Sequence, residues 1–331
     1  MDRNLVPLMP VSEFSLIDRY LATQGLSRSD VALGIGDDCA LLLPPTGQHL
    51  VVTMDTLVAD VHFFAATDPA GLGHKALAVN LSDLAAMGAT PAWATLALTL
   101  PAADENWLGR FCRGLFALAD RHGVQLVGGD TTHGPTTVIT IQAHGFIPPG
   151  LALRRDGAKP GDGIYVTGTP GDAGLALAAA CGKTTVVAEY RDYIRRRLEW
   201  PEPRIAQGLA LRGIASAAID ISDGLAQDLG HILERSRVGA RLEVERLPLS
   251  PALAASLDRD AALMFALASG DDYELCFTVP PERTVQLEAL VTDWDCCCTR
   301  IGVITAEPGL RLIRADGSDF RLERLGYDHF G

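Results

Sequence analysis

The sequence predicts a two-domain α+β protein (α/β in each half), with mixed or antiparallel sheets that carry helices on one face. Its 331 residues are about twice the length of an average domain. Strand and helix patterns occur in both halves without a strict strand–helix–strand repeat, which favours α+β sheets. The segment richest in proline and glycine runs from residue 148 to residue 161. We therefore expect one domain at 1–149 and a second at 150–331.

The elements of the first half are marked by turn residues and by apolar spacing. A helix is predicted at 13–24, and a second begins at the N-cap pair Asp68-Pro69 and ends before Gly88. Strands are predicted where β-branched and apolar residues cluster between turn residues. In order, the further elements are a strand at 49–57, a strand at 93–100, a helix at 105–122, a short strand at 124–127 that ends in Gly-Gly-Asp, and a strand at 136–146.

The second half repeats this mixture of elements. Strands are predicted at 163–167, 218–221, 241–244, 273–279 and 298–304, and helices at 173–180, 191–200, 203–217 and 224–235. Three adjacent arginines, Arg195, Arg196 and Arg197, fall within one of these helices. We interpret them as a solvated helix face rather than as a binding run.

The charge of the chain excludes one large class of partner. The net charge is −13, and nucleic-acid binding depends mainly on clustered Lys and Arg, so no nucleic-acid partner is expected. The acidic residues are 28 Asp against 13 Glu. Asp is a poorer helix former than Glu and favours turns and metal sites. This excess therefore suggests that functional Asp residues lie in loops.

The cysteines and the hydropathy pattern favour the cytoplasm. The seven cysteines are odd in number, and three of them are adjacent at 296–298, where neighbours on a strand point to opposite faces. We therefore expect reduced thiols and no metal site at these cysteines. No run reaches the roughly 18 apolar residues that a membrane-spanning helix needs, and residues 1–10 do not resemble a secretory leader.

Aspartates recur beside glycine at the predicted ends of strands. The sets are Gly36-Asp37-Asp38, Gly129-Asp130, Asp220-Ile-Ser-Asp223-Gly224 and Gly270-Asp271-Asp272, with Asp55 and Asp83 elsewhere. Each set alone is ordinary turn chemistry. If the carboxylates converge, their repulsion requires counter-charge, and oxygen-rich clusters suit Mg²⁺, which typically bridges carboxylates to substrate phosphates. The pattern therefore predicts a metal–nucleotide site.

Other familiar phosphate and hydrolase motifs do not occur. Cys181-Gly-Lys-Thr184 matches the end of a P-loop motif, but Leu177 occupies the position where the motif requires its first glycine. The protein-kinase motif set, the GxSxG elbow and the HExxH helix are also missing. The glycine-rich segment 168–174 follows a strand and opens a helix, so a phosphate site and a structural turn both remain open there.

Longer segments carry a resemblance to a known family. They are EFSL at Glu13, GIGDDCAL at Gly34, MDTLVADVHF at Met54, KALAVNLSDLAAMGA at Lys75, GGDTT at Gly128, GAKPGDGIYVTGTPGDAG at Gly157, IDISDGLAQDLGHI at Ile219, SGDDYELCF at Ser269 and GYDHF at Gly326. In this order, nearly end to end, the sequence resembles the thiamine-monophosphate kinase family, which is related to aminoimidazole-ribonucleotide synthetase. The resemblance implies N- and C-terminal domains like those of that synthetase, a homodimer that pairs through the N-terminal domain, and ATP- and Mg²⁺-dependent phosphorylation of thiamine monophosphate to thiamine diphosphate.

The resemblance also implies roles for individual residues. Several magnesium ions would be held by Asp38, Thr53, Met54, Asp55, Asp83, Asp130, Asp220 and Asp223. The nucleotide would meet Gly129, Asp130, Arg155 and Ser222, and thiamine monophosphate would meet His62, Asp271 and Tyr327. Two positions depart from the family pattern, which usually has Glu at Asp271 and Ser or Thr at Met54. The substrate contact is then one methylene shorter, and Met54 could reach a metal only through its backbone carbonyl.

The implied acceptor shapes the expected mechanism. A phosphate oxygen is already anionic at pH 7, so we expect direct in-line transfer with no covalent nucleophile, assisted by metal at residues such as Asp55 and Asp130. Two alternatives stay open. One is another ATP-dependent enzyme of the superfamily. Selenophosphate synthetase needs a lysine near its N-terminus, whereas the first lysine here is Lys75, and the hydrogenase-maturation protein ends in a cysteine that this sequence does not have at its end. The other is a regulatory protein that binds nucleotide or divalent ions without turnover.

Overall fold

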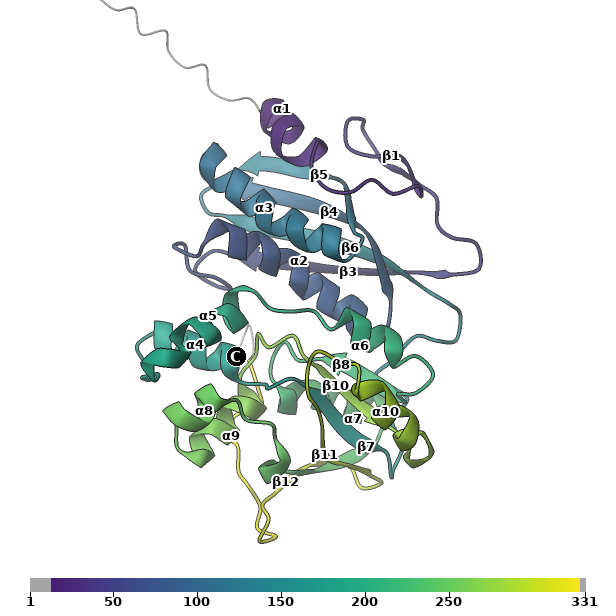
Figure 1. Ribbon diagram of the computed structural model, residues 1–331, viewed down its shortest axis with the longest axis vertical. Coiled ribbons are helices and arrows are strands. Elements are labelled where there is room, and N and C mark those ends of the chain that lie inside the picture. Colours follow the sequence, from purple (N-terminus) through teal and green to yellow (C-terminus); the bar gives the residue numbers. More distant parts are fainter. Residues whose placement is uncertain (1–12, 328–331) are drawn as a thin grey trace, which may run out of the picture. The chain divides into compact units, whose positions relative to one another are not determined.

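The computed structural model describes residues 13–327 and confirms the mixed α+β architecture (Figure 1). A four-stranded sheet has the strand order β3-β6-β4-β5, and a six-stranded sheet has the order β12-β9-β11-β7-β10-β8. Strands β1 and β2 form a separate small sheet. Of the predicted segments, residues 1–10 and most of the final GYDHF motif lie outside the described residues.

The first part of the chain supplies the four-stranded sheet and its helices. Its elements are α1 (Glu13–Leu16), the π-helix η1 (Ile17–Ala22), β1 (Val31–Leu33), β2 (Leu41–Leu42), β3 (His49–Val58), α2 (Pro69–Ala86), β4 (Thr90–Leu100), α3 (Glu105–Arg121), β5 (Gln125–His133) and β6 (Val138–Ile147). Helices α2 and α3 lie over the same face of this sheet (Figure 1). A Cβ at Gly73 would come 2.0 Å from the Phe111 carbonyl oxygen, and one at Gly114 would come 1.8 Å from that of Ala70. The two helices therefore cross in backbone contact, which only glycine permits.

Strand β3 alternates between two environments. Leu57 is buried, whereas Leu50, Val52 and Met54 expose 47%, 48% and 62% of their surface. Residues two apart on a strand share a face, so one face of β3 presents a row of apolar side chains. Thr53 and Asp55 alternate with this row and are partly buried.

The second part of the chain supplies the six-stranded sheet. Its elements are β7 (Gly163–Thr167), α4 (Asp172–Ala180), η2 (Ala188–Tyr190), α5 (Arg191–Glu199), α6 (Ile205–Ala210), β8 (Ala217–Asp220), α7 (Leu225–Ser236), β9 (Gly239–Glu243), η3 (Val244–Arg246), α8 (Pro251–Ser256), α9 (Arg259–Ala268), β10 (Leu275–Val279), η4 (Pro281–Arg283), α10 (Thr284–Val291), β11 (Cys298–Thr305) and β12 (Gly309–Ile313). All neighbouring strands pair antiparallel except β12, which runs parallel to β9. Apolar residues of α7 and α9, including Leu229, Ile232 and Leu263, form the main core with the inward side chains of the strands.

Several predicted boundaries are wrong. Strand β5 does not end at the Gly-Gly-Asp sequence but continues to His133, parallel to β4, with Asp130 opposite Ala97. This is possible because a Cβ at position 129 would lie 1.9 Å from the Leu96 carbonyl oxygen, so only glycine fits. Strand β10 begins at Leu275 rather than at residue 273, and α6 covers only part of 203–217. Strand β12 has no counterpart in the sequence prediction.

The described chain divides into two compact units. The first comprises the chain up to Pro44, Met54–Leu77 and Trp93–Gln142; the second comprises Pro45–Thr53, Ala78–Ala92 and the chain from Ala143 onward. This division passes through β3 and α2, and the predicted linear boundary between residues 149 and 150 stays a prediction. No helix among residues 13–327 is long and apolar enough to cross a bilayer.

Candidate functional site

In the second unit, the loop after β8 is held by a carboxylate from the helix that follows it. Oδ2 of Asp228, in the first turns of α7, accepts the backbone N–H groups of Ser222, Asp223 and Gly224, each at 3.1 Å. Burial and the nearby charge of Asp223 raise the pKa of Asp228 to about 7, although the N–H groups lower it. The predicted ligands Ser222 and Asp223 therefore sit on a fixed backbone rather than on a mobile turn.

A second group of predicted ligands is connected through α2. Thr53 Oγ1 donates a hydrogen bond to Asp83 Oδ2, and Ser82 Oγ donates to Asp220 Oδ2 at 2.8 Å. Burial raises the pKa of Asp83, while the Thr53 hydrogen bond and the positive charge of Arg155 lower it only in part. The structure thus brings together Thr53, Asp83, Asp220 and Arg155 in the second unit. A partly buried carboxylate in this state is one that a bound cation would stabilise.

The segment before β10 lies directly against the loop after β8. The Asp271 N–H donates to the Ser222 carbonyl oxygen at 2.8 Å, and the Tyr273 N–H donates to that of Ile221 at 2.8 Å. Asp271 and Tyr273 adopt φ values of 67° and 52°, a left-handed region that non-glycine residues seldom enter. The Tyr273 hydroxyl also donates to Asp271 Oδ1 at 2.9 Å.

The predicted substrate contact Tyr327 joins the same neighbourhood. Its N–H donates to the Asp223 carbonyl oxygen at 3.0 Å, and its own carbonyl oxygen accepts from Gln227 Nε2 at 2.8 Å. Its side chain is 43% exposed. Ser222, Asp223, Asp271 and Tyr327, which are as much as 105 residues apart in the sequence, are therefore linked by backbone hydrogen bonds.

Buried charges lie behind the Asp271 segment. Glu274 is fully buried, and its two oxygens accept from Arg204 Nε and Nη2 at 2.6 Å each, from Arg197 Nη2 at 2.8 Å and from Thr167 Oγ1 at 2.7 Å. Burial alone would raise the pKa of Glu274, but the two guanidinium groups lower it to about 2. The prediction that Arg197 belongs to a solvated face is wrong: its side chain is only 15% exposed, because it compensates buried carboxylates. Arg195 and Arg196 are exposed, as predicted.

The remaining predicted residues belong to the first unit. Asp38 is exposed on the loop before β2, and its N–H donates to Asp37 Oδ1 at 2.8 Å. Asp55 and Met54 lie on β3, with Met54 on the exposed apolar face. Because the Val58 N–H donates to His62 Nδ1 at 3.0 Å, the proton of the neutral imidazole lies on Nε2.

Gly129 and Asp130 are exposed on β5 of the same unit, and Gly129 has a φ of 153°. Among residues 13–327, no group of three His, Cys, Asp or Glu side chains is close enough to hold a metal ion by itself. The donors in the predicted metal set are nevertheless all oxygens, the chemistry that Mg²⁺ prefers.

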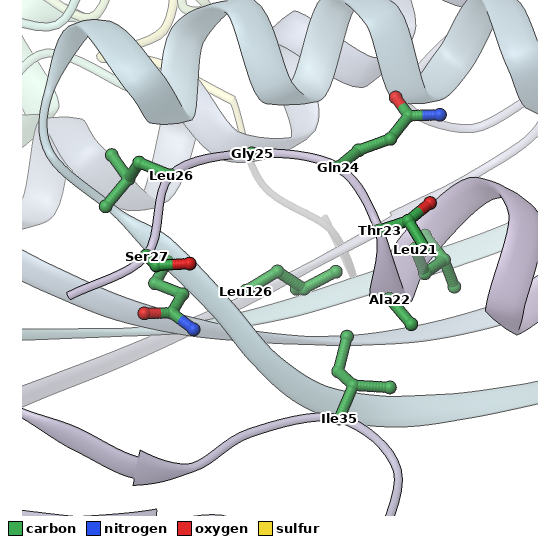
Figure 2. A pocket seen from close by; sticks show the side chains of 10 residues that line it. Leu21, Ala22, Thr23, Gln24, Gly25, Leu26, Ser27, Ile35 and Leu126 are labelled. Carbon is green, nitrogen blue, oxygen red and sulfur yellow. The ribbon is translucent and has the colours of Figure 1, made fainter.

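A small cavity in the first unit lies apart from all of these residues. It measures about 110 Å³ and lies under residues 21–27, with Ile35, Gln125 and Leu126 as its other walls (Figure 2). Gln125 Oε1 accepts the Arg28 N–H at 2.7 Å. None of the predicted site residues lines this cavity.

The chain is similar to known proteins along most of its length. Two family models match: AIR synthase related protein, N-terminal domain, at residues 36–147, and AIR synthase related protein, C-terminal domain, at residues 159–315. The chain is 53% identical over 324 residues to thiamine-monophosphate kinase of Escherichia coli (strain K12), covering 97% of this chain and 99% of that protein. The chain belongs to the thiamine-monophosphate kinase family.

Solved structures of this family superpose on the chain. Thiamine-monophosphate kinase from Stenotrophomonas maltophilia K279a gives a TM-score of 0.85 at 49% identity, covering 92% of this chain and 97% of that one. AaThiL complexed with AMPPCP and TMP gives a TM-score of 0.76 at 30% identity, covering 87% and 89%. The predicted family and two-domain fold class are confirmed.

Two residues that support the candidate site received no predicted role. Asp228 and Glu274 lie within the quoted segments IDISDGLAQDLGHI and SGDDYELCF, but roles were predicted only for other residues of these segments. A signal existed for each. Asp228 follows Gly224 at the start of an apolar helix, where a carboxylate can accept orphan N–H groups, and Glu274 directly precedes the apolar run LCF. Their partners Arg197 and Arg204 carry no comparable signal, because pairing depends on tertiary contacts.

Proposed function

We propose that the chain transfers the γ-phosphoryl group of ATP to thiamine monophosphate, giving thiamine diphosphate and ADP. The observation that carries this proposal is 53% identity to a thiamine-monophosphate kinase over 97% of the chain. The hydrogen-bonded neighbourhood of Ser222, Asp223, Asp271 and Tyr327 supports it, because nucleotide-binding and substrate-binding residues must lie close together for direct transfer.

We propose that several Mg²⁺ ions are held by side-chain and backbone oxygens of this chain. The residues are Asp38, Thr53, Met54 through its backbone carbonyl, Asp55, Asp83, Asp130, Asp220 and Asp223. When bound, Mg²⁺ supplies positive charge that offsets the repulsion between the phosphates. The fit is supported by the all-oxygen donor set and by the raised pKa of Asp83, whose carboxylate a bound cation would stabilise. Mg²⁺ is usually bound by one or two carboxylates together with substrate phosphates, so it needs no all-protein cage.

We assign Gly129, Asp130, Arg155 and Ser222 to the nucleotide. Arg155 is exposed and can offer its planar guanidinium to two phosphate oxygens at once. Any side chain at position 129 would collide with Leu96, so glycine leaves the β5 backbone without a side chain at this point. The Ser222 backbone is fixed by Asp228 and can therefore orient its hydroxyl without reorganisation.

We assign His62, Asp271 and Tyr327 to thiamine monophosphate. The Nε2–H of His62 is a suitable donor to a phosphate oxygen. A carboxylate repels phosphate, so Asp271 is better suited to the cationic thiazolium ring or to the amino group of the pyrimidine ring. Its side chain is one methylene shorter than Glu, and the Tyr273 hydroxyl fixes its direction.

We further propose direct transfer without a phosphorylated enzyme. The acceptor oxygen is anionic at pH 7, so no side chain has to remove a proton from it. The chain's residues bind and align the two substrates, which accounts for most of the catalysis in phosphoryl transfer. Trapping a phosphoenzyme after mixing with ATP alone would exclude this version.

We also propose that the protein is a cytoplasmic homodimer. The exposed apolar row Leu50, Val52 and Met54 on β3 supports self-association, because such a row is seldom left in water. All seven cysteines are free thiols, which fits a reducing compartment.

The function is tested by following thiamine diphosphate and ADP with ATP, thiamine monophosphate and varied Mg²⁺. We expect one ADP per thiamine diphosphate and no ADP without thiamine monophosphate. Asp223→Asn should lower kcat/KM by about 100-fold or more, because it removes a charge from the proposed metal site. The control Asp319→Asn, on an exposed residue that pairs with Arg311, should not change it. ADP formation that does not depend on thiamine monophosphate would indicate another ATP-dependent reaction. ATP binding without turnover would indicate a regulatory protein.

A further inference from the structure

Asp272 lies between two residues of strained backbone. Asp271 and Tyr273, on either side of it, both have positive φ values. Asp271 is partly exposed, whereas Asp272 is 1% exposed and points into the domain. A turn of this kind persists only when surrounding contacts hold it, so the buried side chain between the two strained residues is the natural anchor.

The Asp272 side chain is hydrogen-bonded to the beginning of a helix. Asp272 Oδ2 accepts the Gly171 N–H at 2.7 Å, and Gly171 is the N-cap residue of the nine-residue helix α4. The N-terminus of a helix carries partial positive charge and N–H groups without partners, which suit a carboxylate. A Cβ at Gly171 would lie 2.8 Å from the Ala266 nitrogen, so α4 and α9 approach closely at this point. Asp272 thereby ties the turn to a rigid junction of two helices.

Arg197 supplies positive charge close to this hydrogen bond. This guanidinium donates to Glu274 at 2.8 Å and lies 3.9 Å from Asp172 Oδ2, and its charge also acts on Asp272. Asp172 is held in turn by Ser250, Thr169 and Tyr193. No residue described here donates to the other oxygen of Asp272, Oδ1. Asp272 is thus fixed at one oxygen by the Gly171 N–H, next to a network that joins α4, α5 and the segment before β10.

We propose that Asp272 is a positioning residue for recognition of thiamine monophosphate. Its buried carboxyl group, held by the Gly171 N–H, fixes the strained turn that presents Asp271 to the substrate. This inference rests on the proposed function in one respect, the contact between Asp271 and thiamine monophosphate. Asp272 itself touches neither substrate and acts only through its neighbour.

The test measures binding rather than turnover, so it does not depend on the reaction itself. Calorimetry gives Kd for thiamine monophosphate and for the ATP analogue AMPPCP with full-length Asp272→Ala and Asp272→Asn. We expect Asp272→Ala to raise Kd for thiamine monophosphate by about tenfold or more, with a change of less than about twofold for AMPPCP. Asp272→Asn should restore binding to within about threefold of the wild type, because its amide oxygen still accepts the Gly171 N–H.

Two further variants separate positioning from general loss of stability. Asp162 is another buried acid that accepts a backbone N–H, that of Lys159 at 3.0 Å, and also accepts from Ser216. Asp162→Ala should lower Tm and leave both Kd values unchanged. In an Asp271→Ala background, adding Asp272→Ala should cause no further loss of thiamine monophosphate affinity, because the residue through which it acts is gone.

Several results would overturn the inference. They are equal weakening of both ligands by Asp272→Ala, unchanged binding of thiamine monophosphate, failure of Asp272→Asn to restore it, or a full additional loss in the Asp271→Ala background. If Asp272→Ala does not fold, Asp272→Ser replaces it. That variant shortens the side chain so that it no longer reaches the Gly171 N–H, and unchanged Kd for thiamine monophosphate would then decide against the inference. An absence of thiamine diphosphate formation by the wild type, with these Kd changes intact, would contradict only the proposed function.

Discussion

Two acidic loops of the second unit, the 220–224 loop after β8 and the 271–274 segment before β10, are held by different means. Asp228 supports the first with three backbone N–H groups and no cation. Glu274 anchors the second with two guanidinium groups and a hydroxyl. The pKa values differ accordingly, at about 7 for Asp228 and about 2 for Glu274. The backbone N–H groups fix the first loop but offset only part of the cost of burying the Asp228 charge, whereas the paired arginines fix the second loop and stabilise the Glu274 charge. The first loop should therefore respond to pH and the second to loss of its cations.

The largest expected effect comes from removing a cation behind the second loop. Arg204→Met leaves the buried Glu274 with one guanidinium, and breaking a buried pair typically costs about 3–5 kcal/mol. Urea unfolding measures the loss. The control Arg195→Met, on an exposed arginine of α5, should stay within about 0.5 kcal/mol of the wild type. If Arg204→Met lost as little stability as the control, the claim that paired arginines stabilise the second loop would be contradicted.

The pH dependence of stability distinguishes the two carboxylates. The folded pKa of Asp228, about 7, is raised above the unfolded value of about 3.9, so the native state binds its proton more tightly. Its contribution is therefore greatest below about pH 4 and is lost as pH rises toward 7, on the order of 4 kcal/mol at most. Glu274 behaves oppositely, because its lowered pKa gives stability that is lost as pH falls toward about 2.

Asp228→Asn isolates the first of these effects. The amide oxygen can still accept N–H groups but does not ionise, so the variant should gain stability relative to the wild type as pH rises from 4 to 7 in the absence of metal. Urea unfolding of both proteins across this range measures the difference. A difference that does not vary with pH would contradict the assignment to Asp228.

Disturbing the close backbone contact between the two loops should cost less stability. A Cβ at Gly270 would lie 2.2 Å from the Ser222 carbonyl oxygen, so Gly270→Ala must push the loops apart, at a cost of about 1–3 kcal/mol. Gly230→Ala, in α7 where no heavy atom lies within 4 Å, should instead stabilise the protein by up to about 1 kcal/mol. Thermal unfolding of the two variants checks this pair. Equal shifts of Tm in the same direction would show that the loops do not depend on close backbone contact.

The smallest effect concerns a single hydrogen bond. Tyr273→Phe removes the donor to Asp271 Oδ1, a bond worth about 0.5–1.5 kcal/mol, and should raise Kd for thiamine monophosphate by about 2–10-fold. AMPPCP binding, measured in the same calorimeter, should not change. Weakened AMPPCP binding would show that Tyr273 supports both loops rather than Asp271 alone.

The sequence predicts the elements whose signals are local. Asp68-Pro69 and Gly88 bound α2 as expected, and β7 occupies the predicted residues 163–167. Elements that depend on distant partners are predicted less well. Strand β5 extends beyond its glycines because Gly129 fits against Leu96, and β10 starts late because Tyr273 is held in a left-handed conformation by neighbouring segments.

The candidate site divides in the same way. Partly exposed acidic residues beside glycine, such as Asp223 and Asp271, are visible in the sequence as turn residues, and a chemical role can be predicted for them. The buried residues that hold them are not, because Arg197 in a row of three arginines looks like its solvated neighbours until Glu274 is placed beside it. Motifs therefore identify candidate ligand-binding residues, and three-dimensional contacts are needed to find the residues that hold them in place.

The most direct test of the account is a product assay that separates the roles of the two loops. Thiamine diphosphate formation is measured while thiamine monophosphate and Mg²⁺ are varied independently, with the wild type, Asp223→Asn and Asp271→Asn. We expect the wild type to form thiamine diphosphate from ATP and thiamine monophosphate. Asp271→Asn should raise KM for thiamine monophosphate by about tenfold with little change in the Mg²⁺ midpoint, and Asp223→Asn should shift the Mg²⁺ midpoint upward. A wild type that forms no thiamine diphosphate, or two variants that change the same parameter equally, would contradict it.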